Sequence, residues 1–258
     1  MDLKLENKVV LITGSGQGLG KGIAERFLSE GASIILTDIQ AKRLESAKLD
    51  LQNKFEDAKI FTFRGNLTQN KDISECIKFS IKNFGRIDIL VANLGSGRSI
   101  PDWNPSDDEW KRVMELNFEG ARKMTNIVVP YMIEQGQGNI VYISSIAGKE
   151  VIGAPVAYSV AKASVIAYSK NLSVKLAPMG IRVNTVSPGN IFFEGGDWDS
   201  KTKQDKHKVI SMLESTVPLK RFTSPEEIAD LVLYLSSDKA AFITGSNITI
   251  DGGQTVAI

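Results

Sequence analysis

The sequence predicts an α/β protein built on one doubly wound, parallel β-sheet with helices on both faces. Short runs of aliphatic and β-branched residues alternate with segments of helical periodicity along all 258 residues. The runs are apolar at successive positions, which is typical of strands covered on both sides. No linker rich in proline, glycine or serine and no internal repeat breaks this alternation, so residues 1–258 are expected to form a single domain.

About seven strands are expected, with helices between them. The strands are predicted at 9–12, 33–37, 59–63, 87–91, 139–144, 181–186 and 247–250. The helices are predicted at about 18–30, 42–53, 72–83, 108–135, 156–177 and 225–236. The last of these has the clearest pattern, because one apolar face recurs at i, i+3, i+4 and i+7 in Ile228, Leu231, Val232 and Leu235. Residues 188–208, rich in glycine, charge and aromatic rings, are expected to form a mobile loop.

The composition narrows the classes of function. Lys and Arg total 31 against 30 Asp and Glu, so the charge balance gives no reason to expect nucleic acid or an anionic membrane as a partner. No apolar run approaches the roughly 20 residues that span a bilayer, and the N-terminus lacks the shape of a signal peptide. One cysteine, Cys76, and one histidine, His207, make a disulfide or a protein-bound metal site unexpected. A cytoplasmic protein is therefore expected.

A glycine-rich turn follows the first predicted strand and opens the first predicted helix, in the segment Thr13-Gly14-Ser15-Gly16-Gln17-Gly18-Leu19-Gly20. Free backbone N–H groups and the positive end of a helix dipole bind phosphate at such a turn. The alternative interpretation is an ordinary strand-to-helix turn. The favoured one is a Rossmann-type dinucleotide site, whose contacts are expected from Gly14, Ser15, Gln17, Gly18, Leu19 and Gly20.

Asp38 stands at the end of the second predicted strand, where its carboxylate can accept hydrogen bonds from both ribose hydroxyls of an adenosine. The same charge would repel a 2′-phosphate, so the sequence favours NAD over NADP. Lys42 and Arg43 follow closely and could weaken that preference, although solvated charges on a helix surface are the favoured interpretation of both.

Tyr158 and Lys162 are four positions apart in a predicted helix, which places both side chains on one face. An ammonium group near a phenol stabilises the phenolate and lowers its pKa. The serine pair Ser144 and Ser145 ends the fifth predicted strand, at the edge where active sites of parallel sheets gather. An amphipathic helix with a snorkelling lysine is the alternative, but together with the glycine turn these residues predict proton transfer beside a bound dinucleotide.

The glycine spacing, the Tyr158–Lys162 pair and the serines resemble the classical short-chain dehydrogenase/reductase family, and the resemblance runs from Lys8 to Gly253. It implies an NAD(H)-dependent enzyme that interconverts an alcohol and a carbonyl. The family's serine lies thirteen residues before its tyrosine, which selects Ser145 over Ser144. The resemblance also implies that Asn117 helps to order a proton-relay water. The catalytic set it implies is Asn117, Ser145, Tyr158 and Lys162.

Other family motifs match with departures. Asn66 and Leu67 stand where the family usually has an aspartate that contacts the adenine. In Ala92-Asn93-Leu94-Gly95, which corresponds to the family's Asn-Asn-Ala-Gly, only Asn93 and Gly95 are kept. The segment Ser187-Pro188-Gly189-Asn190-Ile191 matches the part that meets the nicotinamide carboxamide, but Phe193 occupies the usual threonine position. The cofactor contacts expected from these motifs are Asn66, Leu67, Asn93, Gly95, Tyr158, Lys162, Pro188, Gly189 and Ile191.

The substrate is expected to be a small alcohol or carbonyl compound, polar and sugar-like, bound beside loop 188–208. Its predicted contacts are Arg98, Ser145, Glu194 and Trp198, although these charges could equally point into solvent. A reductase of 3-oxoacyl thioesters is the nearest alternative enzyme. A catalytically silent dinucleotide-sensing protein is the alternative of another class. The resemblance also implies a homotetramer or homodimer, with interface helices around Tyr168 and Leu231.

Overall fold

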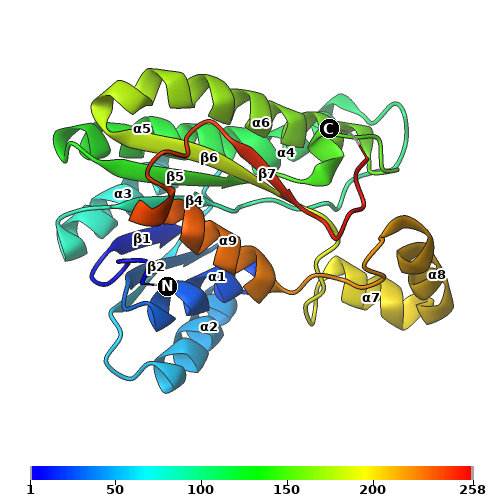
Figure 1. Ribbon diagram of the computed structural model, residues 1–258, viewed down its shortest axis with the longest axis horizontal. Helices are drawn as coiled ribbons and strands as arrows, with labels where there is room; N and C mark the ends of the chain where they lie inside the picture. The colour runs from blue at the N-terminus through cyan, green and yellow to red at the C-terminus, as the bar shows by residue number, and fades with distance from the viewer. Residues whose placement is uncertain (1, 257–258) are drawn as a thin grey trace.

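A computed structural model describes residues 2–256 of the protein. Seven strands form one sheet in the order β3-β2-β1-β4-β5-β6-β7, and every pairing between neighbours is parallel (Figure 1). The fold class predicted from the sequence is thus confirmed. The strands are β1 Val9–Ile12, β2 Ser33–Asp38, β3 Ile60–Arg64, β4 Ile89–Ala92, β5 Gly138–Ile143, β6 Ile181–Pro188 and β7 Asn247–Ile250.

Three helices cover each face of the sheet. In β1 the side chains of Val10 and Ile12 join the apolar core on one face, while those of Val9 and Leu11 join the core on the other. The first core is completed by α1 Gly18–Ser29, α2 Ala41–Lys54 and α9 Pro225–Ser236. The second is completed by α3 Asn70–Phe84, α5 Gly120–Glu134 and α6 Val156–Leu176 (Figure 1).

The helix predicted over 108–135 is not continuous. It divides into α4 Asp107–Met114, a π-helical turn over Glu115–Glu119, and α5. The apolar periodicity of the two halves concealed this turn. Single π-helical turns inside longer helices occur frequently at functional sites, and this one contains Asn117.

The segment predicted as an irregular loop over 188–208 contains helical structure instead. Helix α7, Asp197–Gln204, and helix α8, Lys206–Thr216, project beside the open end of the sheet (Figure 1). Val209, Leu213 and Val217 form a small apolar cluster against which Trp198 packs. This cluster gives the two helices a core of their own, which the charged composition did not reveal.

The order of the strands places a crevice at the carboxyl ends of β1 and β4. The chain proceeds from β1 to β2 on one side of the sheet and reaches β4 on the other side, so β1 marks the topological switch point. Open α/β sheets bind ligands at this point. Within residues 2–256 no helix is long and apolar enough to cross a membrane, and no group of three His, Cys, Asp or Glu side chains is placed to hold a metal ion.

Candidate active site

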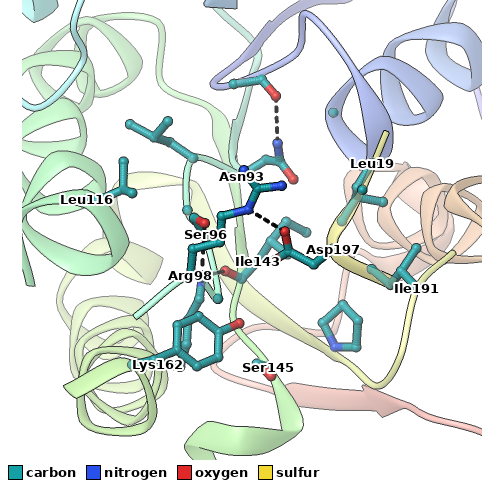
Figure 2. A pocket seen from close by; sticks show the side chains of 18 of the residues that line it. Leu19, Asn93, Ser96, Arg98, Leu116, Ile143, Ser145, Lys162, Ile191 and Asp197 are labelled. Carbon is teal, nitrogen blue, oxygen red and sulfur yellow. Dashed lines mark hydrogen bonds and ion pairs between the residues drawn. The ribbon is translucent and has the colours of Figure 1, made fainter. Parts of the chain in front are cut away.

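A cavity of about 720 Å³ opens at the carboxyl ends of the central strands. It brings together most of the residues that the sequence singled out, from positions as distant as Leu19 and Ile191 (Figure 2). The predicted residues that line it are Gly14, Gln17, Leu19, Gly20, Asp38, Asn66, Leu67, Asn93, Gly95, Arg98, Ser145, Tyr158, Lys162, Pro188, Gly189, Ile191 and Trp198. Ser15, Gly18, Asn117 and Glu194 do not line it.

The glycine turn is held in shape by side chains that the sequence did not single out for this task. Gly14 has a φ of +64°, and a Cβ on Gly20 would lie 2.4 Å from the Gly14 carbonyl oxygen, so both positions require glycine. The buried Ser15 hydroxyl donates to the carbonyl of Ile12 at 2.9 Å and accepts the Thr37 N–H at 2.9 Å. The Ser15 side chain therefore stabilises the turn and does not face the cavity.

Thr13 and Asn93 join the turn to the end of β4. The Asn93 side-chain amide donates to the carbonyl oxygens of Thr13 and Gly14 at 2.9 and 3.1 Å. The Thr13 hydroxyl oxygen accepts the backbone N–H groups of Asn93 and Leu94, each at 2.9 Å. Asn93 was predicted to bind the cofactor, but its amide nitrogen is committed to holding the turn.

Asp38 lies against the glycine turn at the end of β2. A Cβ on Gly16 would lie only 2.6 Å from Asp38 Oδ2, so Gly16 gives the carboxylate room to approach the loop. Asp38 Oδ1 accepts the Gln40 N–H at 2.8 Å, which fixes its orientation. Arg43 lines the same part of the cavity and is half-buried, whereas a fully solvated side chain was the favoured expectation.

Tyr158, Ser145 and Lys162 all line the cavity, and Figure 2 labels Ser145 and Lys162 there. Burial raises the pKa of the Tyr158 phenol, a hydrogen bond with Ser145 opposes that rise, and the Asp197 carboxylate adds to it. Lys162 Nζ lies 5.8 Å from the centroid of the Tyr158 ring and donates to the Ile143 carbonyl at 3.0 Å. Burial, rather than Lys162, therefore dominates the pKa of Tyr158 in this structure, contrary to the sequence expectation.

Burial also lowers the pKa of Lys162 to about 8, because a charged ammonium is poorly solvated at a position that is only 4% exposed. Two neighbours fix the helix that carries Lys162. The Ser144 hydroxyl donates to the Lys162 carbonyl at 2.8 Å. A Cβ on Gly148 would lie 2.7 Å from the same carbonyl carbon, so only glycine permits this close approach. Ser144 is thus a support for α6, as the choice of Ser145 requires.

Asn117, in the π-helical turn, lies close to the predicted catalytic residue Lys162. Its Nδ2 donates to the Val113 carbonyl at 3.1 Å, and its Oδ1 accepts the Ser96 N–H at 2.9 Å. A Cβ on Gly95 would lie 2.8 Å from Asn117 Oδ1 and 3.0 Å from Lys162 Nζ. Gly95 therefore lies between Asn117 and Lys162, two residues of the predicted relay. Gly95 itself lines the cavity, so Asn117 lies directly behind the cavity wall.

Asn66 lines the cavity and its predicted contact with adenine stays a prediction. Its Oδ1 accepts the backbone N–H of Thr68 at 3.2 Å and the Thr68 hydroxyl at 2.9 Å, which closes a local turn. On the other side of the cavity, Gly189 donates its N–H to the Ile250 carbonyl at 2.9 Å, and Ile191 bridges to Thr223. These backbone contacts position the segment that was predicted to meet the nicotinamide carboxamide.

The mouth of the cavity is crossed by an ion pair that the sequence did not reveal. Arg98 Nε lies 2.5 Å from Asp197 Oδ1, and both residues line the cavity (Figure 2). The Trp198 ring also lines it, with Lys201 Nζ 4.3 Å from the ring centroid. Glu194, predicted to contact the substrate, is exposed and outside the lining. In this segment of the chain Asp197, rather than Glu194, is the carboxylate that lines the cavity.

The Phe193 ring lies against the start of α1, where a Cβ on Gly18 would be 2.6 Å from the ring. The neighbouring Glu194 side chain is exposed. The ring also covers the backbone at Gly18 that was predicted to approach a pyrophosphate.

Comparison with known proteins supports one family. The family model described as enoyl-(acyl carrier protein) reductase matches residues 14–255. The 3-oxoacyl-[acyl-carrier-protein] reductase FabG of Thermotoga maritima is 36% identical over 256 residues, which cover 98% of this chain and all of the relative. The NAD-dependent glycerol dehydrogenase of Listeria innocua is 33% identical over 257 residues, covering 99% of this chain and 96% of the relative.

A solved structure extends the likeness to the whole fold. L-sorbose reductase from Gluconobacter frateurii, complexed with NADPH and L-sorbose, superposes with a TM-score of 0.94 at 32% identity, covering 100% of both chains. With the glycine turn, the Tyr158–Lys162 helix and the parallel sheet in place, these matches leave one assignment: the chain belongs to the short-chain dehydrogenase/reductase family.

Proposed function

We propose that this oxidoreductase interconverts a secondary alcohol and a carbonyl by NAD(H)-dependent hydride transfer on a polar, hydroxyl-rich substrate. The observation that carries the proposal is the meeting of Ser145 with Tyr158, beside Lys162, in the same cavity as the glycine turn and Asp38. A proton-transfer group and a dinucleotide cradle thus share one space, as a hydride-transfer enzyme requires.

The residues present fit a nicotinamide dinucleotide. Asp38, oriented by Gln40 and given room by Gly16, would accept hydrogen bonds from the adenosine ribose and disfavour a 2′-phosphate. The first turn of α1 supplies backbone N–H groups for the phosphates, and Lys162 would hold the nicotinamide ribose. The cofactor, when bound, supplies the hydride acceptor or donor.

The side chains of this chain manage the proton. In the oxidation direction Tyr158 must first be the phenolate, which then removes the proton of the substrate hydroxyl, while Ser145 holds the substrate oxygen beside it. In reduction Tyr158 returns the proton to the carbonyl oxygen, for which its raised pKa keeps the phenol protonated at neutral pH. Lys162 Nζ and Asn117 Oδ1 flank Gly95 and would lead the proton from Tyr158 toward solvent through ordered water.

Charged and aromatic groups around the mouth favour a hydroxyl-rich substrate. Arg98, Asp197 and Trp198 line the cavity together, and such groups suit a polyol or sugar better than an aliphatic ketone. The names of the sorbose reductase and the glycerol dehydrogenase are consistent with this preference. The FabG relative favours the second candidate, a 3-oxoacyl-thioester reductase.

Steady-state assays separate the two candidate activities. Initial rates of nicotinamide absorbance change are measured with NAD(H) and NADP(H) for a panel of polyols and ketoses and for an acetoacetyl thioester. We expect kcat/KM to be highest for a polyol or ketose with NAD(H). Turnover of the thioester alone would exclude the hydroxyl-rich substrate. The absence of turnover with every substrate, together with tight NADH binding, would favour a dinucleotide-sensing protein.

Replacing Tyr158 by Phe tests the proton-transfer role directly. The Tyr158→Phe variant keeps the ring and loses the phenol, so we expect kcat to fall by about 10²- to 10⁴-fold while NADH binding, followed by fluorescence, stays unchanged. A variant that retains a substantial share of the wild-type kcat would contradict the role assigned to Tyr158.

We also propose that the protein assembles as a homotetramer or homodimer and is located in the cytoplasm. Tyr168 packs edge-on against Phe118 and Tyr142 within the chain, and the partly buried Leu231 packs against the core. Each of these two side chains therefore has only part of its surface available for a subunit interface. On α6, however, Val160 and Val174 are 41% and 67% exposed. Light scattering after size-exclusion chromatography would measure the mass, and a monomer at micromolar concentration would contradict the assembly. Cell fractionation tests the location.

A further inference from the structure

The Arg98–Asp197 ion pair joins two segments that are distant in the sequence across the mouth of the cavity. Arg98 lies in the loop after β4, and Asp197 is the first residue of α7. The Arg98 side chain is 70% exposed and that of Asp197 is 38% exposed. An ion pair this open to solvent contributes little to stability, so stability alone does not account for its place at the cavity.

The loop that presents Arg98 is held firmly from the side of α4. The Arg112 guanidinium donates to the Arg98 carbonyl at 2.9 Å. Glu109 Oε1 accepts the Ser99 hydroxyl at 3.0 Å and the Ile100 N–H at 3.2 Å. The hydrogen bond with Arg112 lowers the pKa of Glu109 to about 2, so this carboxylate remains charged at every physiological pH. The backbone at Arg98 is therefore anchored, while its guanidinium remains exposed at the mouth.

Asp197 offers an acceptor above the reacting centre. Its Oδ1 is engaged by Arg98, and within residues 2–256 no donor forms a hydrogen bond with its Oδ2. A Cβ on Gly97 would lie 3.9 Å from Oδ2, so the loop at Gly97 does not crowd that oxygen. The Asp197 charge reaches Tyr158 strongly enough to contribute to the raised pKa of the phenol. A carboxylate oxygen is thus available beside the predicted proton donor.

We propose that Asp197, oriented by Arg98, binds a hydroxyl group of the substrate next to the reacting carbon, and that this ion pair selects hydroxylated substrates over plain secondary alcohols. The inference rests on the proposed function and adds its recognition element. A charged carboxylate forms stronger hydrogen bonds with hydroxyl groups than a neutral acceptor does, and an adjacent hydroxyl is what distinguishes a polyol from a simple alcohol.

Asp197→Asn tests the proposal, because it keeps the size of the side chain and removes its charge. We expect kcat/KM for the best polyol to fall by about 10- to 100-fold, mainly through KM, while kcat/KM for a monohydroxylic alcohol such as 2-butanol changes by no more than about twofold. Arg98→Ala should cause a smaller loss on the polyol, because Asp197 remains in place. Asp230→Asn is the matched control, since it breaks the exposed Arg26–Asp230 pair outside the cavity and should leave both rates unchanged.

A second measurement reports on Asp197 without any substrate. The charged groups that face Tyr158 are Lys162 from α6, Asp197 from α7 and, through its ion pair, Arg98 from the loop after β4. Ultraviolet titration of the phenol, with Tyr158→Phe as the blank, should give a lower Tyr158 pKa in Asp197→Asn than in the wild type. An unchanged Tyr158 pKa would contradict the closeness of the Asp197 charge to the phenol, on which the proposal depends.

The possible results distinguish a failure of the role proposed for Asp197 from a failure of the proposed function. Wild-type protein that acts on polyols, combined with an Asp197→Asn variant of unchanged substrate preference, overturns the role of Asp197 and leaves the proposed function standing. Wild-type protein that acts only on a 3-oxoacyl thioester overturns the proposed substrate class and hydroxyl recognition together. A lowered Tyr158 pKa with a selective loss on the polyol supports both.

Discussion

Gly95 separates Asn117 from Lys162, and replacing it by Ala would push both out of place. The new Cβ would lie 2.8 Å from Asn117 Oδ1 and 3.0 Å from Lys162 Nζ, where about 3.4 Å is the lower limit of ordinary contact. Asn117 is held by Ser96 and Val113, and Lys162 by Ile143, so neither can withdraw without breaking a hydrogen bond. A displacement of several tenths of an ångström therefore results at the proposed proton-transfer centre.

We expect Gly95→Ala to lower kcat by about 10- to 100-fold, since small misplacements of catalytic groups have effects of this size. Gly97→Ala is a matched control in the same loop, because its Cβ would meet nothing nearer than Asp197 Oδ2 at 3.9 Å. Steady-state rates with NAD and the best substrate, together with thermal unfolding of both variants, measure the effect. A Gly95→Ala variant with wild-type kcat, or an equal loss in Gly97→Ala, would refute the reasoning.

Three further outcomes follow from the cavity. Phe193→Thr removes the ring that covers Gly18, so NADH affinity measured by fluorescence should rise by about tenfold; unchanged affinity would show that the ring does not compete. Asp38→Ala removes the charge beside Gly16 and leaves Arg43, so the NADP-to-NAD ratio of kcat/KM should increase by about tenfold or more, and a constant ratio would contradict the role of Asp38. Lys162→Met removes a buried ammonium group whose pKa is lowered to about 8. As the pH increases from about 8 toward 10.5, the free energy of unfolding of the wild type should therefore rise relative to that of the variant, by up to roughly 3 kcal/mol. Urea-unfolding free energies that change in parallel with pH would contradict this.

The sign of that last effect follows from proton binding. Between the folded pKa of about 8 and the ordinary value of 10.5, the unfolded chain keeps the Lys162 proton while the folded chain has lost it. The unfolded state then binds more protons, so raising the pH favours the folded state. Below pH 8 the folded wild type carries the full desolvation penalty, which the uncharged methionine avoids.

The sequence predicted the sheet because its strands are buried on both faces. In β1 four successive apolar residues, Val9 to Ile12, serve two cores at once, and a run of that kind is visible without any structure. The meeting of Tyr158 with Lys162 was equally accessible, since a spacing of four residues fixes one helical face.

The features that escaped prediction depend on contacts between distant segments. Asp197 faces the cavity because α7 folds onto its own apolar cluster, whereas the charged sequence of 188–208 indicated a loop and drew attention to Glu194 instead. The support roles of Thr13 and Asn93 require β1 and β4 to be neighbours, and a hydroxyl or amide side chain carries no sign of its partner in the sequence. Only the strand order makes these contacts visible.

The π-helical turn at Glu115–Glu119 makes the site depend on residue count as well as residue identity. A π turn accommodates one residue more than an α-helical turn, and each residue advances an α-helix by about 100°. Deleting a single residue between α4 and α5 would convert the turn into regular helix and leave the two halves in register. Asn117 would then lose the widened turn that places its Oδ1 beside Gly95. Length in this segment is therefore under constraint even where its side chains are exposed.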